Sequence, residues 1–382
     1  MEKLLPWILT LSIVAGQLIK IPLGTTGGLT LLDIVISIFS ILGLTQIKFN
    51  LIKPATFVKA ALIFIAICIM SLVFTPLHLN LSEYLIAFFY TVRFSLYILF
   101  GWLLQSGSLF QLRENIYKIL IFSGVILAAL GLLQFVFLPD LSFLTLAGWD
   151  PHYYRTVSTF LDPNFAGAYF VLTLLLLLPY SPRWLRLLGV TLVYVALLTT
   201  FSRSGYLMFL ISCLSYSLLK KSKSLFFKTI IAFVILLVGF QIYTQLISKP
   251  RHIDREKSAS FRLNTWQQGW AMFQKSPFLG VGYNAYRYGL KEYHLGDEQF
   301  IQSHGGSSND SSLLFVLSTT GIIGFFSYLF FLFSIIKSGW KSNFIIVSGL
   351  IGLIIHSFFA NSLFYPPILA WVILATVAIP KK

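Results

Sequence analysis

The chain has 382 residues, of which 57% are hydrophobic and only 11% charged, whereas soluble domains carry about 25% charged residues. No fold in water could cover so much apolar side chain, so a soluble globular protein is excluded. The formal net charge is +15, but most Lys and Arg lie in short segments between apolar runs. That pattern is typical of membrane orientation and not of a nucleic-acid-binding surface, so we expect the lipid bilayer, not nucleic acid, as a partner.

Apolar runs follow one another along the chain, and most approach the ~20 residues that a helix needs to cross the hydrocarbon core. They predict an all-α polytopic membrane protein, with residues 1–382 forming a single membrane domain of about twelve transmembrane helices. The first run follows Met1-Glu2-Lys3 without a convincing cleavage site, so we expect an uncleaved first helix. The runs occupy residues 4–20, 29–46, 57–75, 81–104, 116–138, 164–180, 184–201, 204–219, 226–247, 312–336, 344–364 and 366–379.

The distribution of Lys and Arg predicts the orientation of these helices, because short cytoplasmic loops carry an excess of positive charge. An N-terminus in the cytoplasm places more than half of the basic residues inside, whereas the short outer segments hold only Lys20, Arg155 and Arg203. We therefore expect both termini in the cytoplasm. Residues predicted inside include Lys3, Lys48, Lys53, Lys381 and Lys382.

Two outer segments are unlike ordinary connections. Residues 139–163 and the long loop 248–311, inserted between the ninth and tenth spans, contain most of the acidic residues, and five of the six histidines lie outside the cytoplasm. A loop of this length and polarity is uncommon as a simple link. We therefore expect the chemistry of the protein on the extracytoplasmic face.

Arg203 lies in the turn TTFSRSG, residues 199–205, on the outer side where the orientation rule disfavours a positive charge. As a functional residue it would be an anion clamp, since guanidinium donates bidentate hydrogen bonds to phosphate. As a structural residue it would be a snorkelling arginine at a helix end, and topology alone leaves both interpretations open. In the segment RTVSTFLDPN, residues 155–164, Arg155 is a second candidate for anion binding, while Asp162 and Asn164 are plausible helix-capping residues.

Arg93 sits near the middle of the fourth predicted span, where a charge costs at least ~2.5 kcal/mol. It must therefore face the protein interior. Pairing with Asp33 or Glu83 would make it structural, which is the interpretation we favour. Otherwise Arg93 is the only central charge that supports a different class of protein, a transporter or flippase of lipid-linked glycans.

Within the long loop, residues 258–275 predict an amphipathic helix, because Arg262, Trp266, Trp270 and Phe273 recur at helical spacing. Such a helix suits the outer interface of the membrane. Packing of its aromatic residues against the helix ends is a compatible interpretation that the residues support equally well. The segment FLGVGYNAY that follows, residues 278–286, is a glycine-punctuated loop that allows close backbone approach.

The end of the long loop supplies the imidazole of His304 and the carboxylate of Asp310 just outside the membrane. Either could remove a proton from an acceptor hydroxyl. The alternative for Asp310 is an N-cap of the tenth span, worth about 1 kcal/mol, and the residues alone favour it. His294, His304 and Asp310 form no zinc pattern, and the sequence contains no Walker loop or nucleotide fingerprint. These patterns therefore predict neither a zinc site nor a nucleotide-binding site.

Four segments occur in order along the chain: 155–164 with Asp-Pro-Asn, the turn TFSRSG at 200–205, the helix from Phe261 to Trp266 followed by SPFLGVG, and 313–324 with TTGIIG. Taken together, they resemble the bacterial O-antigen ligase and O-antigen polymerase family of envelope glycosyltransferases. The resemblance implies about twelve spans in the bacterial plasma membrane, a large periplasmic loop, and transfer of a glycan from an undecaprenyl-diphosphate carrier to a glycan or lipid acceptor without a metal. It places Arg203 and Arg262 where relatives use arginines thought to hold the donor diphosphate.

The sequence differs from the family pattern at the position of the catalytic histidine. Counted back from Gly321, Asp310-Ser311 occupy the place of the His-Asn pair of relatives, with His304 earlier in the same loop. The catalytic base would be Asp310, or His304 supplied from a shifted loop, or this member works differently. Ser158 also stands where a glycine is expected. We expect an O-antigen ligase-like enzyme, whose acceptor is lipid A core or another surface molecule, and keep a polymerase, whose acceptor is a second carrier-linked glycan, as the alternative.

Overall fold

A computed structural model describes residues 4–23, 27–46, 54–180, 182–248 and 255–378. Both ends of the chain lie outside the described residues, and these ends include Lys3, Lys381 and Lys382. Lys48, Lys53 and residues 249–254 of the long loop also lie outside them. The cytoplasmic location of both termini therefore stays a prediction.

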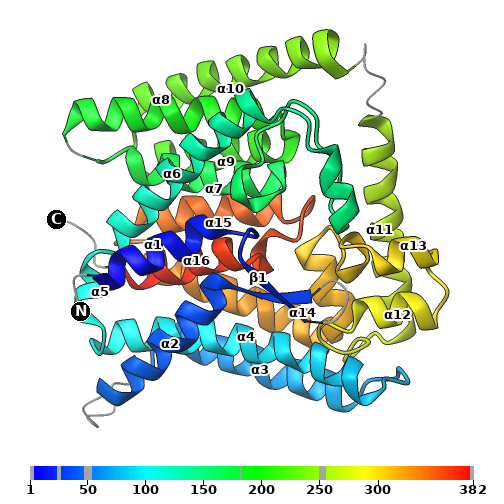
Figure 1. The fold of residues 1–382 in the computed structure, drawn as a ribbon. Coiled ribbons are helices and arrows are strands. Elements are labelled where there is room, and N and C mark those ends of the chain that lie inside the picture. Colours follow the sequence, from blue (N-terminus) through cyan, green and yellow to red (C-terminus); the bar gives the residue numbers. More distant parts are fainter. Residues whose placement is uncertain (1–3, 24–26, 47–53, 181, 249–254, 379–382) are drawn as a thin grey trace. The chain divides into compact units, whose positions relative to one another are not determined.

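The described part of the chain is mostly helical, and each predicted apolar run contains a helix, although runs 4–20 and 344–364 extend beyond the ends of theirs (Figure 1). Among the described residues, six helical segments are long and apolar enough to cross a bilayer: Thr56–Val73, Leu81–Ser106, Ile116–Phe137, Arg183–Thr200, Lys223–Ile247 and Gly305–Gly339. The chain is thus a multi-pass membrane protein, while the count of about twelve spans stays a prediction. The helices on the runs are α1 (Leu5–Ala15), α2 (Leu31–Gln46), α3 (Thr56–Val73), α4 (Leu81–Ser106), α6 (Ile116–Phe137), α7 (Pro163–Leu177), α8 (Arg183–Thr200), α9 (Arg203–Leu219), α10 (Lys223–Tyr243), α14 (Ser312–Gly339), α15 (Phe344–His356) and α16 (Pro366–Val377).

Shorter elements lie between these helices. A helix lies where the sequence predicts an amphipathic one in the long loop: α11 (Arg255–Lys275), which begins slightly earlier than expected. The hydropathy pattern did not predict the antiparallel hairpin of β1 (Lys20–Leu23) and β2 (Gly27–Thr30), in which Lys20 pairs with Thr30. The remaining elements are α5 (Phe110–Glu114), η2 (Ser142–Ala147), η3 (Ser158–Phe160), the π-helical turn η4 (Thr244–Ser248), α12 (Tyr286–Glu292), α13 (Glu298–Gln302), η5 (Gly305–Ser307) and η6 (Ser362–Phe364).

The chain forms two compact units that interleave in sequence. The first unit comprises Met1–Ile19, Asn115–Ser260 and Gly339–His356, and the second comprises Lys20–Glu114, Phe261–Ser338 and Ser357–Lys382. The apolar pattern, from which we predict a single membrane domain, contains no sign of this division. Arg155 and Arg203 belong to the first unit, whereas Arg262, His304 and Asp310 belong to the second.

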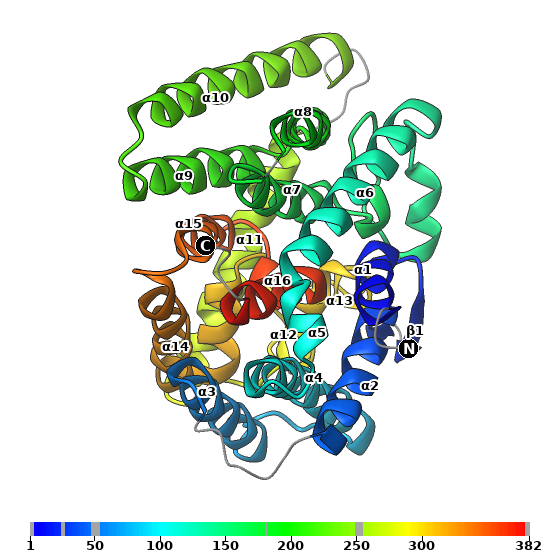
Figure 2. The same cartoon turned by 90° about the vertical axis from the view of Figure 1, so that its left-hand side faces the viewer.

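In the first unit, α9 packs against both α10 and α15, and Figure 2 shows α9 and α10 side by side. The contact with α15 is close because it is made by small residues. A Cβ added to Gly352 would overlap the hydroxyl of Ser212 on α9. Ser348 and His356 stand one turn on either side of Gly352, and all three are buried. In a membrane, where lipid tails are as apolar as the helices, such close packing is a principal source of helix association.

The core of the second unit is aromatic. Phe64 of α3 meets Phe94 of α4 edge to face, with ring centroids 5.6 Å apart, and lies 4.8 Å from Tyr328 of α14. Tyr328 in turn stacks on Phe364, 5.1 Å away. Offset and edge-to-face arrangements of this kind add to the packing energy of the rings. They join α3 and α4, which lie side by side in Figure 1, to α14 and η6.

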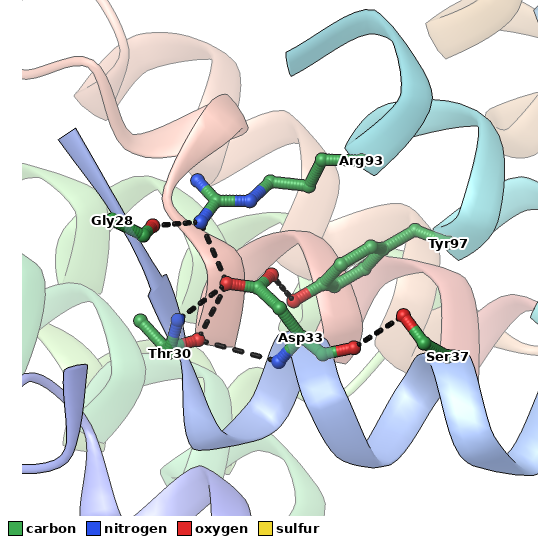
Figure 3. Close-up of polar contacts among 6 residues, drawn as sticks. All are labelled: Gly28, Thr30, Asp33, Ser37, Arg93 and Tyr97. Atoms are coloured by element: carbon green, nitrogen blue, oxygen red, sulfur yellow. Dashed lines mark hydrogen bonds and ion pairs between the residues drawn. The ribbon is translucent and has the colours of Figure 1, made fainter. Parts of the chain in front are cut away.

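Arg93 of α4 is paired as the structural interpretation predicts (Figure 3). One Nη donates to Asp33 Oδ2 at 2.6 Å and to the Gly28 carbonyl. The same carboxylate accepts from the hydroxyl of Tyr97 at 2.9 Å and from the backbone N–H and hydroxyl of Thr30, each at 2.8 Å. A buried charge that is paired and hydrogen-bonded in this way is stable inside a protein. Arg93 therefore holds α2, α4 and the hairpin together.

Glu83, the other carboxylate that could have paired with Arg93, has a different role. Its side chain accepts from the backbone N–H of Asn80 at 3.0 Å, while Asn80 Oδ1 accepts from the N–H of Glu83 at 3.0 Å. This reciprocal pair is a capping box at the start of α4. It explains why the sequence has a carboxylate one helix turn into the span.

Candidate functional site

Helix α7 begins at the Asp-Pro-Asn segment. Asp162 Oδ1 accepts from the backbone N–H groups of Asn164 at 2.6 Å and Phe165 at 3.1 Å. Pro163 follows at the first helical position, where its missing N–H costs nothing. The predicted capping role of Asp162 is confirmed.

Helix α9 begins in the TFSRSG turn. Phe201 ends α8 in the left-handed conformation at φ 46°, and Ser202 caps α9 by accepting from the N–H of Gly205 at 3.2 Å. Arg203 is therefore the first residue of α9, and it is exposed. The N-terminus of a helix carries partial positive charge, so helix and guanidinium together favour an anion at this position.

The side chain of Asn164 joins the starts of α7 and α9. Its Oδ1 accepts from the hydroxyls of Ser202 at 2.7 Å and Ser204 at 3.4 Å. The prediction that Asn164 caps a helix is wrong, because its side chain binds the neighbouring helix while Asp162 supplies the cap. Two of the four segments that carry the family resemblance thus form one hydrogen-bonded structure in the first unit.

Arg155 contacts the end of α8. Its Nε donates to the Thr200 carbonyl at 2.8 Å, and Nη2 lies 3.5 Å from the Phe201 carbonyl. These carbonyls belong to the last turn of a helix, which lacks partners for its C=O groups and carries partial negative charge. Arg155 therefore stabilises the turn that precedes Arg203.

Two histidines near these helix starts were not among the predicted site residues. His152 is 8% exposed, and burial lowers its pKa to about 4, with the Arg155 charge acting in the same direction and Asp162 opposing it. His356, the last residue of α15, is 0% exposed, with Nε2 3.3 Å from Ser204 Oγ. A single ionisable residue inside an apolar run is a signal of function, and His356 in the run 344–364 carries that signal.

In the second unit, Asp310 lies against α11. Its Oδ2 accepts from the hydroxyl of Thr265 at 3.4 Å, and the same hydroxyl is 3.0 Å from the Arg262 carbonyl one turn earlier. The N-cap interpretation of Asp310 is wrong: Ser311 Oγ accepts from the N–H of Leu314 at 3.3 Å at the start of α14. The carboxylate of Asp310 is instead turned to the part of α11 that carries Arg262.

Asn309, beside Asp310, anchors the end of the long loop. It is 0% exposed, and its Nδ2 donates to the Thr265 carbonyl and to the Tyr286 hydroxyl, 3.0 Å away. Burial raises the pKa of Tyr286, and the Asp310 charge does so too. The two hydrogen bonds of the Asn309 amide connect the end of the long loop to both α11 and α12.

His304 occupies a basic environment. Arg287 Nη2 donates to the carbonyl of the preceding residue, Ser303, at 2.8 Å. Burial lowers the pKa of His304 to about 4, and the charges of Lys20 and Arg287 act in the same direction. At neutral pH the imidazole is uncharged and able to accept a proton.

The glycine-rich loop after α11 docks into a break in α14. Gly321 adopts φ 64°, and a Cβ there would overlap the Phe278 carbonyl. The carbonyls that the break frees accept from the loop, Ser318 from the N–H of Val281 and Thr319 from that of Gly282, each at 3.0 Å. The SPFLGVG and TTGIIG segments therefore need glycine because two backbones touch.

The described residues bring together no three His, Cys, Asp or Glu side chains that could hold a metal ion.

The apolar helices and their polar connections define a multi-pass membrane protein. A model of the O-antigen ligase family matches residues 187–329. The match covers 143 of the 382 residues and contains three of the four segments that carry the resemblance, which confirms that this region is similar to the O-antigen ligase family. No curated protein matches the chain. The matched region contains Arg203, Arg262, His304 and Asp310, while Arg155 precedes it.

Proposed function

We propose that the protein transfers a glycan from an undecaprenyl-diphosphate carrier to an acceptor on the extracytoplasmic face of the bacterial plasma membrane, as an O-antigen ligase. The observation that carries this proposal is the family match over residues 187–329. That stretch includes both the exposed arginine at the start of α9 and the loop that ends at Asp310.

Arg203 and Arg262 are the proposed donor-binding residues. At Arg203 the guanidinium and the N-terminus of α9 both attract negative charge, which grows on the diphosphate as its bond to the sugar breaks. Arg262 is half-buried on α11, one turn from the Thr265 that binds Asp310. Arg155 is the third proposed residue, and we expect it to act mainly by holding the α8 carbonyls that precede Arg203.

Asp310 and His304 are the two candidates for the base. In the proposed step the acceptor hydroxyl oxygen bonds to the anomeric carbon, the bond from that carbon to the carrier diphosphate breaks, and the hydroxyl proton moves to the base. The diphosphate leaves with the electron pair of the broken bond. The reaction energy resides in that bond and arginines offset the charge, so we propose that neither metal nor cofactor is needed.

A polymerase of the same family is the closest alternative, since it differs only in using a second carrier-linked glycan as acceptor. The transporter or flippase loses its main support because Arg93, the central charge on which it rests, is bound to Asp33. A charge that already has a buried carboxylate partner is poorly suited to binding a passing anionic head group.

The decisive experiment gives the purified protein in liposomes an undecaprenyl-diphosphate-linked oligosaccharide, with and without a separate acceptor. Donor consumption only in the presence of the acceptor supports the ligase. Longer glycans on the carrier without a separate acceptor would identify a polymerase. Movement of the donor across the bilayer without any transfer would contradict both and identify a flippase.

A further inference from the structure

A buried chain of hydrogen bonds connects α15 to the start of α9. His356 Nε2 lies 3.3 Å from Ser204 Oγ, which lies 3.4 Å from Asn164 Oδ1. His356 and Ser204 are 0% and 5% exposed. Asn164 also accepts from Ser202 at 2.7 Å. Arg203 stands between the two serines, so both of its neighbours in the backbone are held by the same amide oxygen.

The Ser204 hydroxyl has one proton and three partners: Ser202 Oγ at 3.2 Å, His356 Nε2 at 3.3 Å and Asn164 Oδ1 at 3.4 Å. The amide oxygen can only accept, whereas His356 Nε2 donates to Ser204 in one tautomer and accepts from it in the other. A side chain at position 356 without a hydrogen-bonding atom would remove this partner from the buried Ser204 hydroxyl in either case.

The packing of α9 on α15 sets the register in which this contact forms. Gly352 lies one turn before His356, and a Cβ there would overlap Ser212 Oγ and lie 3.1 Å from the Met208 carbonyl. Ser204, Met208 and Ser212 recur at four-residue intervals on α9, opposite the same intervals on α15. A shift by one residue would drive a side chain into the space that only glycine leaves, so His356 is held opposite Ser204.

We propose that His356 is a positioning residue of the donor site, which through Ser204 and Asn164 fixes the first turn of α9 and so orients Arg203 toward the donor diphosphate. The inference rests on the proposed function, because Arg203 is the group through which His356 acts. Being fully buried, His356 itself does not touch the donor. Small displacements of a group that binds the reacting part of a substrate cost up to about a hundredfold in rate.

The first test compares kcat/KM for the lipid-linked donor in three variants assayed in liposomes. His356→Leu, which removes the hydrogen-bonding nitrogen at similar volume, is expected to lower kcat/KM by about ten- to a hundredfold. His356→Gln, whose amide can donate to or accept from the same hydroxyl, is expected to restore most of the loss. Ser348→Ala is the matched control, because Ser348 is buried on the same face of α15 two turns away and is expected to leave transfer unchanged. Equal losses in His356→Leu and His356→Gln would overturn the proposal.

A double-mutant cycle separates this inference from the proposed function. If His356 acts through Arg203, adding His356→Leu to Arg203→Ala should reduce kcat/KM little further, whereas independent effects multiply. Multiplying effects would overturn the positioning role. If Arg203→Ala alone left transfer at the wild-type rate, that result would contradict the proposed donor-binding role of Arg203 itself.

A spectroscopic readout tests the positioning without any donor. The two native cysteines, Cys68 and Cys213, are buried, so a spin label on an Arg203→Cys variant should report on the start of α9. We expect His356→Leu and Ser204→Ala to increase the mobility of this label, and Ser348→Ala to leave it unchanged. Identical mobility in all three backgrounds would contradict the proposal, even if His356→Leu were too poorly active to assay.

Discussion

Arg93 and Arg203 are both arginines on helices of a membrane protein, but their surroundings differ in kind. The side chain of Arg93 is 10% exposed within α4 and binds Asp33 at 2.6 Å (Figure 3). Arg203 begins α9 and is exposed, next to N–H groups whose partial charge has the same sign as its own. From this comparison we expect that burial and the position of an arginine in its helix separate a structural charge from one suited to binding an anion.

Removing the partner of Arg93 should produce the largest effect. Asp33→Ala leaves a buried guanidinium without its counter-charge, so we expect the free energy of unfolding to fall by ~3 to 5 kcal/mol. Glu83→Ala, which removes only a helix cap, should cost about 1 kcal/mol. Thermal unfolding in detergent, followed by tryptophan fluorescence, measures both. Similar losses in the two variants would argue against the assignment of Asp33 as the partner.

Arg203→Ala should have the opposite profile, with a large effect on transfer and a small one on stability. Loss of one group that stabilises developing negative charge typically lowers the rate by about a hundred- to a thousandfold. Arg183→Ala is a matched control, because Arg183 is also an exposed first residue of a helix, at the start of α8, whereas Arg203 follows the end of α8. We expect this control to transfer glycan at the wild-type rate in the liposome assay, and a comparable loss in both variants would remove the special role of Arg203.

The pH dependence of transfer distinguishes the two candidate bases. Because the pKa of His304 is lowered to about 4, the imidazole stays unprotonated at pH 5 to 8, and kcat/KM should be flat across this range. An ordinary histidine would lose activity as the pH falls through about 6.5. Lys20→Met removes one of the charges that lower this pKa, so it should move the acid limb of the profile upward if His304 is the base. An unchanged acid limb would favour Asp310.

The smallest effect is expected at the cap of α7. Asp162→Ala removes the acceptor for the N–H groups of Asn164 and Phe165, and we expect a loss of about 1 kcal/mol in unfolding free energy. Asp162→Asn keeps an acceptor oxygen and should stay within a few tenths of a kcal/mol of wild type. Chemical or thermal denaturation distinguishes these outcomes, and equal destabilisation would mean that the charge of Asp162 matters more than its cap.

Local features were predictable from the sequence. The apolar runs predicted where helices lie, and the aromatic spacing in the long loop predicted α11. Asp162 before Pro163 predicted the start of α7, because capping depends on residues within one turn. The free-energy cost of a charge inside a membrane span likewise predicted that Arg93 has a partner in the protein.

Features that depend on distant residues were not predictable. Asp33 and Arg93 are 60 residues apart, and sequence left Glu83 equally possible as the partner. Asp310 looked like a helix cap because it is acidic and precedes an apolar run, but the neighbouring Ser311 takes that position. The sequence did not indicate a role for His356, because its contact is with Ser204, 152 residues away in the chain.

The sequence by itself determined that this is a helical membrane protein with segments that resemble the O-antigen ligase family, since apolar length, charge placement and short ordered segments are all local properties. Only the tertiary structure decided which polar groups pair: Arg93 with Asp33, Asn164 with the serines around Arg203, and the glycine loop with the break in α14. The physical reason is that a hydrogen bond or ion pair forms only within a few ångströms. Which residues come that close depends on how the helices pack, through small residues such as Gly352, and not on any one segment.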